Sequence, residues 1–141
     1  MNASLSLIAS LAAAITCSVW AQTGEPLAKN MSGRWIFLGK RTNSDVMSVA
    51  LEGDGAPGAI TGRLTLRGSN CGALDEPFKG TWDGVELRFS ALLRSNVNAR
   101  RANMECAADA TQFVLTRKPG QAALEGNASA STGTFQVTLA P

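Results

Sequence analysis

The chain has 141 residues, the length of a single domain, and no histidine among them. The lack of histidine excludes Ser/His/Asp and Cys/His catalysis and removes the commonest metal ligand. A net charge of +2, from 13 basic and 11 acidic side chains, is too small to predict a polyanionic partner such as nucleic acid.

The N-terminal segment has the composition of an export signal. Residues 3–21 (ASLSLIASLAAAITCSVWA) are apolar or small, and no charged side chain precedes Glu25. Ala21, with Val19 two positions earlier, suits cleavage by signal peptidase. We therefore expect residues 1–21 to be a signal peptide and the mature protein to be periplasmic or secreted, with membrane contact only through the cleaved segment.

Two alternatives to a cleaved signal remain. A permanent anchor would need about 20 solidly apolar residues, and serines interrupt the run here. A lipoprotein would be acylated at Cys17, but Thr16 and Ile15 stand where a small residue should precede the cysteine. Cleaved export is the interpretation that the composition favours.

From residue 34 onward, short runs rich in Val, Ile, Leu, Phe, Thr and Trp are separated by glycine-rich breaks, which is typical of an all-β protein. Apolar and polar residues alternate within the runs, most strictly in 59–67, where Ile60, Leu64 and Leu66 share one face. Asp83-Gly84 predicts a tight hairpin. The expected strands are 34–40, 46–52, 59–67, 77–82, 84–93, 110–118, 122–125 and 133–140.

Strands with one apolar and one polar face, joined by short connections, favour antiparallel pairing of chain neighbours. A series of hairpins leaves two exposed sheet edges, and closure removes both. We predict an all-β fold: an antiparallel up-and-down β-barrel of about eight strands, formed by residues 33–141 after a polar leader at 22–32. A two-sheet β-sandwich is the alternative.

Two cysteines, Cys71 and Cys106, remain after removal of the signal. In an oxidising compartment a pair of cysteines predicts one disulfide, and closing so long a loop would stabilise the fold by roughly 4 kcal/mol. Free thiols in redox chemistry are the alternative, although no Cys-x-x-Cys spacing is present.

The stretches MSGRWIF and MSVALEGDGAPGAITGRLTL resemble the first two hairpins of the avidin-like barrels, at Gly33-Arg34-Trp35 and Ile60-Thr61-Gly62. Gly-x-Trp in a first strand is also similar to the broader calycin group. That resemblance implies that Trp35 closes one end of the barrel and that a basic side chain lies over it. Arg117 is a possible substitute for that basic residue. The resemblance does not extend to biotin binding. The chain has no tyrosine, and Leu64 stands near the position where the tyrosine of the biotin site would come.

A second resemblance is to META-type domains of bacterial envelopes. Those domains pair a loop that contains Gly and Cys with a later Met-x-Cys. Here Ser69-Asn70-Cys71-Gly72 and Met104-Glu105-Cys106 are the matching segments.

An eight-stranded barrel has an interior just large enough for side chains or one small ligand. We expect no cofactor and no metal; Glu52 and Asp54, for example, are too few for calcium. The residues expected to bind a ligand inside the barrel are Trp35, Met47, Leu64, Trp82, Phe89 and Phe113, with Val49, Ile60, Leu87, Leu115 and Phe135 also lining it.

The basic residues Arg94, Arg100 and Arg101 lie in the polar segment 94–103 and are candidates for contact with an anion or a partner, a solvated loop being the alternative. The expected function is an exported calycin-like binding module, not an enzyme, that holds a small apolar molecule. The alternative is a periplasmic protein-interaction module, such as an inhibitor or immunity-like factor, that binds an envelope protein through its loops. Catalysis by paired carboxylates such as Asp75 and Glu76 ranks last.

Overall fold

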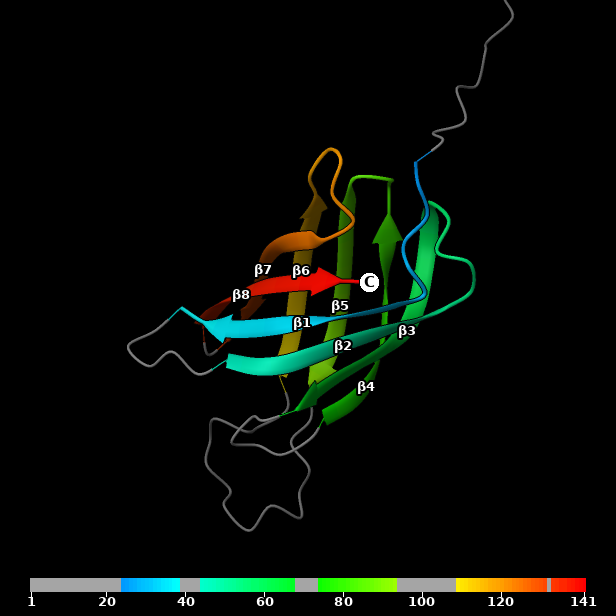
Figure 1. Ribbon diagram of the computed structural model, residues 1–141. Helices are drawn as coiled ribbons and strands as arrows, with labels where there is room; N and C mark the ends of the chain where they lie inside the picture. Colours follow the sequence, from blue (N-terminus) through cyan, green and yellow to red (C-terminus); the bar gives the residue numbers. More distant parts are fainter. Residues whose placement is uncertain (1–23, 39–43, 68–73, 94–108, 132) are drawn as a thin grey trace, which may run out of the picture.

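The computed structural model describes residues 24–38, 44–67, 74–93, 109–131 and 133–141. They form eight strands (Figure 1): β1 (Asn30–Phe37), β2 (Ser44–Glu52), β3 (Gly58–Arg67), β4 (Leu74–Trp82), β5 (Glu86–Leu93), β6 (Asp109–Arg117), β7 (Leu124–Ala130) and β8 (Gly133–Ala140). The expected signal peptide lies outside the described residues.

Each strand pairs antiparallel with the next along the chain, and β8 pairs with β1. The closing ladder aligns Gly33 with Leu139 and Trp35 with Val137. Closure leaves none of the eight described strands with an unpaired edge, which is the physical reason for preferring it over an open meander. The predicted up-and-down barrel is confirmed, and the sandwich alternative is wrong.

The up-and-down order gives the barrel two distinct ends. Four connections, after β1, β3, β5 and β7, leave from one end, which we call the loop end. The connections after β2, β4 and β6 leave from the other end, where the C-terminus also lies. Residues 24–29, which we call the strap, cross this second end before entering β1 (Figure 1), so we call it the strap end.

Alternation within the strands puts one side of each strand inside the barrel. In β3 the inward side chains of Ile60, Leu64 and Leu66 are buried, while Arg63 and Arg67 are exposed. In β4, Phe78 lies over the inward-facing Gly62 of β3, where a Cβ atom would come within 2.7 Å of the phenyl ring. The phenyl ring of Phe78 therefore fills the space that Gly62, which has no side chain, leaves on the neighbouring strand.

The strand boundaries differ from expectation mainly at three elements. β1 begins at Asn30, because Met31 already pairs with Val49 and is buried in the core. β4 begins at Leu74, which pairs with Leu66. β7 runs to Ala130 although its sequence, LEGNASA, is poor in strand-forming residues, since both neighbouring ladders supply partners.

The hairpin between β4 and β5 also differs in detail. The amide of Asp83 donates to the Glu86 carbonyl at 3.3 Å, so the two residues between them are Gly84 and Val85, and not Asp83-Gly84. Gly84 has the positive φ of 99° that this turn requires. Val85 falls within the expected strand 84–93, but it lies in the turn and is 57% exposed.

Candidate functional site

The six residues expected to bind a ligand all lie inside the barrel. None of Trp35, Met47, Leu64, Trp82, Phe89 and Phe113 exposes more than 6% of its surface. Three of their rings and that of Phe78 make a chain of contacts: between ring centroids, Phe78 lies 4.6 Å from Phe89, Phe89 stacks on Phe113 at 4.3 Å, and Trp35 lies 5.6 Å from Phe113. Trp35 also contacts Phe135 at 4.1 Å.

These contacts make the described interior a packed core. Met47, Leu64, Leu87 and Leu115 have no accessible surface, so they border neither solvent nor a cavity wide enough to admit water. The interior is also almost wholly apolar around them; the buried Thr111 is an exception, and its hydroxyl has no hydrogen-bond partner in the structure. The binding role of the six residues stays a prediction, whereas their packing role is visible.

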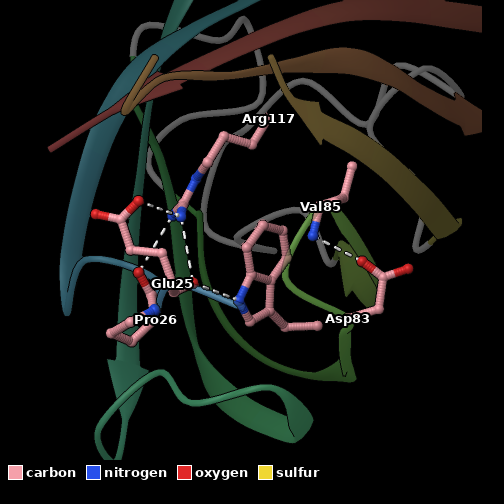
Figure 2. A network of polar contacts seen from close by, with 6 residues as sticks. Glu25, Pro26, Asp83, Val85 and Arg117 are labelled. Carbon is pink, nitrogen blue, oxygen red and sulfur yellow. Dashed lines mark hydrogen bonds and ion pairs between the residues drawn. The ribbon is translucent and has the colours of Figure 1, made fainter. Parts of the chain in front are cut away.

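The strap end is closed by a polar network around Trp82 and Arg117 (Figure 2). The Trp82 Nε1–H donates to the Glu25 carbonyl at 3.1 Å. Arg117 donates to the carbonyls of Glu25 and Pro26, each at 3.2 Å, and its Nη1 lies 3.5 Å from the Glu25 carboxylate. The guanidinium carbon also lies 4.8 Å from the centre of the Trp82 ring, within reach of a cation–π interaction.

The strap is held at further points along its length. The Leu27 amide donates to the Gly55 carbonyl at 2.9 Å, and the Lys29 carbonyl accepts from Leu51 at 2.8 Å. The Leu27 side chain is buried in the core. At the start of the strap, Gly24 touches Gly84 so closely that a Cβ on Gly24 would lie 2.5 Å from the Gly84 Cα atom. Main-chain bonds and close packing therefore fix the strap across the barrel end.

This arrangement corrects two expectations and adds residues that the sequence did not point to. Arg117 lies over Trp82 and not over Trp35, the tryptophan of the Gly-x-Trp motif. Residues 22–32 were expected to be an irregular leader, yet Leu27 contributes to the core and residues 30–32 belong to β1. The apolar Leu27 between polar neighbours was the available signal, but the bonds of Glu25 and Pro26 use their backbones and leave no mark in the sequence.

The residues predicted at the loop end lie mostly outside the described part of the chain. This is so for Arg94, Arg100 and Arg101, and for both cysteines of the predicted disulfide, Cys71 and Cys106. The described strand ends bear on the disulfide only indirectly: the connections that contain the two cysteines follow β3 and β5, and both therefore leave from the loop end. The disulfide itself stays a prediction.

Charged side chains on the outer wall are partly paired. Arg63 Nε donates to Asp75 at 2.9 Å, and this hydrogen bond raises the pKa of the Arg63 guanidinium above its usual range. Arg88 pairs with Glu86, and Lys118 with Glu125 at 2.7 Å. All of these pairs are solvent-exposed, so each contributes little to stability.

Asp83 organises the β4–β5 hairpin. Its carboxylate accepts from the amides of Glu86 at 2.6 Å and Val85 at 2.8 Å, and the latter bond is drawn in Figure 2. These two bonds, that of Glu86 first, lower the pKa of the Asp83 carboxyl below its usual range, because backbone amides stabilise the charged form.

A shallow open groove of about 270 Å³ runs over the outer wall of β1–β3 beside Pro141, lined by short polar side chains such as Ser32, Ser48 and Thr65. Over the residues that the structure describes, no group of three His, Cys, Asp or Glu side chains could hold a metal ion. Within the same residues, no helix has the length and apolarity needed to cross a membrane.

No protein-family model matches the chain, and no curated protein matches it either.

Proposed function

We propose that the chain is an exported, non-enzymatic binding module of calycin-like form that acts through the outside of its barrel, on a component of the cell envelope. The observation that carries this proposal is the packed interior. The six side chains expected to line a pocket are buried against one another and against the rest of the core, at 6% exposure or less. A ligand inside would have to displace several of them, and large side chains in a well-packed core move only at considerable cost.

The strap gives the proposal further support. Its hydrogen bonds to Trp82, Arg117, Leu51 and Gly55 cover the described barrel end, so a small molecule has no ready entry there. The charges of the sequence favour the opposite end. The connections that leave from the loop end carry one acidic residue, Glu105, and five basic ones: Lys40, Arg41, Arg94, Arg100 and Arg101.

Tryptophan fluorescence of the mature protein tests this function. Trp35 and Trp82 both lie in the interior, so a ligand entering the barrel must change the surroundings of at least one of them. We expect no quenching and no spectral shift on titration with a panel of fatty acids and alkylphenols, beyond that seen with N-acetyltryptophanamide as control. Saturable quenching by any of these molecules would overturn the proposal and restore the interior ligand.

A further inference from the structure

The outer wall near the loop end carries a patch that combines exposed aliphatic and cationic side chains. On β1, alternation turns Arg34 and Ile36 outward, and Leu38 continues the β1–β8 ladder by donating its amide to Thr134 at 3.1 Å. Val46 of β2 pairs with Arg34 on one side and with Arg67 of β3 on the other. We call these five residues the β1–β3 patch.

Both components of the patch are available to a partner. Leu38 and Val46 are 59% and 54% exposed, which makes them two of the most exposed large hydrophobic side chains in the described chain. Arg34 and Arg67 are exposed as well, and neither forms an ion pair with a described carboxylate, whereas Arg63 nearby is paired with Asp75. Two guanidinium groups that have no carboxylate partner among the described residues therefore flank an exposed valine across three adjacent strands.

The strap end has a small excess of acidic side chains. Its described acidic residues are Glu25, Glu52, Asp54, Asp83, Glu86 and Glu125, against the basic Lys29, Arg88, Arg117 and Lys118, and the last three bases are paired with Glu86, Glu25 and Glu125. The excess of acidic residues at the strap end opposes contact of that end with an anionic surface, whereas the basic connections of the loop end favour it, so the charges favour one orientation of the barrel.

We infer that the β1–β3 patch docks on an anionic phospholipid bilayer. This inference rests on the proposed function and names the envelope component on which the module acts. Guanidinium groups match phosphate oxygens in geometry and charge, and aliphatic side chains beside them reach the boundary of the acyl chains. The bilayer thus satisfies both components of the patch at once.

The shape and composition of the patch favour a lipid surface over an acidic protein. The patch lies on the convex wall of a closed barrel. It contains no tryptophan or tyrosine, the two residue types that, together with arginine, dominate hot spots in protein–protein interfaces. A fluid surface deforms around protruding side chains, whereas a rigid protein partner needs a preformed pocket for each. Membrane contact would then be made by the folded protein, in addition to the expected contact through the signal segment.

Co-sedimentation of the mature protein with vesicles tests the inference. We expect binding to vesicles of phosphatidylcholine mixed with phosphatidylglycerol, weakened by added salt, and little binding to phosphatidylcholine alone. Since a basic residue near an anionic membrane contributes about 1 kcal/mol, Arg34→Gln and Arg67→Gln should each weaken binding about fivefold. Val46→Ser should weaken it by a further factor of about three to ten.

The strap end provides matched controls. Lys29→Gln removes an exposed cation that forms no ion pair with the described carboxylates, and Val85→Ser replaces an equally exposed valine. Both should leave vesicle binding unchanged, and circular dichroism should show that all variants fold. All of these positions are exposed, so loss of folding is not the expected effect.

Three results would overturn the inference: no binding to anionic vesicles, equal losses in patch and control variants, or binding to poly-L-glutamate without binding to vesicles. The last result would indicate an acidic protein as the partner. Each of these outcomes leaves the interior-ligand titration unaffected, so failure of the lipid inference is distinguishable from failure of the exterior-acting function.

Discussion

The two ends of the barrel use the same residue types for different purposes. At the strap end, Arg117 is largely buried, lies on Trp82 and donates to two backbone carbonyls. Near the loop end, Arg34 and Arg67 are exposed and form no ion pair with a described carboxylate. The comparison indicates that an arginine bound to backbone carbonyls stabilises the fold, whereas, under the proposal above, an exposed arginine that has no described carboxylate partner and lies beside Val46 serves in binding.

The largest expected effect on stability is at Trp82, and it tests whether the strap end is part of the core. Trp82→Ala removes a side chain that is 1% exposed and leaves the Glu25 carbonyl with one donor fewer. We expect the free energy of unfolding to fall by about 5 kcal/mol, the upper end for large-to-small changes, measured by urea denaturation. Val85→Ala at the same end should change it by less than about 0.5 kcal/mol. A loss below that of the control would mean that the strap end is not part of the core.

The next largest effect is expected at the loop end. The predicted disulfide would stabilise that end covalently, as the hydrogen bonds of Arg117 stabilise the strap end. Cys71→Ser and Cys106→Ser should each lower the free energy of unfolding by about 4 kcal/mol if the predicted disulfide forms. Mass spectrometry of the native, oxidised protein after treatment with an alkylating reagent measures the link directly. Alkylation of both thiols without reductant would contradict it; the double Ser variant should then be as stable as the wild type.

The sequence predicted the barrel well because its strongest signal is local. Alternation of Leu64 and Leu66 with Arg63 and Thr65 is visible within a few residues, and it is the same alternation that separates the packed interior from the wet wall. Closure followed from the need to remove two sheet edges. Those two arguments were sufficient for the fold class, the strand number and the burial of all six candidate interior residues.

The strap and the turns could not be predicted in the same way. Arg117 bonds to backbone atoms of Glu25 and Pro26, more than ninety positions away along the chain, and neither residue type announces such a bond. Val85 continues the alternation of β5 in the sequence, but the Asp83–Glu86 hydrogen bond places it in the turn. Tertiary and turn contacts override the local pattern at the ends of the barrel.

A smaller effect on stability is expected at Arg117. It distinguishes the directed hydrogen bonds of the guanidinium group from its charge as the cause of the stabilisation. Arg117→Met keeps much of the packing on Trp82 but removes the donor of the Pro26 carbonyl and one of the two donors of the Glu25 carbonyl, which keeps its bond from Trp82. Loss of hydrogen bonds to a charged group lowers the free energy of unfolding by about 2 to 3 kcal/mol. Arg117→Lys retains the charge without the planar fork and should recover only part of that loss. Full recovery by lysine would show that charge, and not geometry, holds the strap.

The smallest effect is a pH dependence at the strap end. Backbone amides of Glu86 and Val85 lower the pKa of Asp83, so folding favours its charged form. The stabilisation is complete above the ordinary aspartate pKa, which is about 3.9, and it is lost as the pH falls below that value through the lowered pKa of the folded state. Carboxyl carbon NMR should therefore report a midpoint for Asp83 below that of an aspartate in an unfolded peptide. In Asp83→Asn the hairpin should lose this acid sensitivity while its amide oxygen still accepts hydrogen bonds. An ordinary midpoint in the wild type would mean that the two amides do not hold the carboxylate in solution, and the β4–β5 turn would then rest on Gly84 and on the bond from the Asp83 amide to the Glu86 carbonyl.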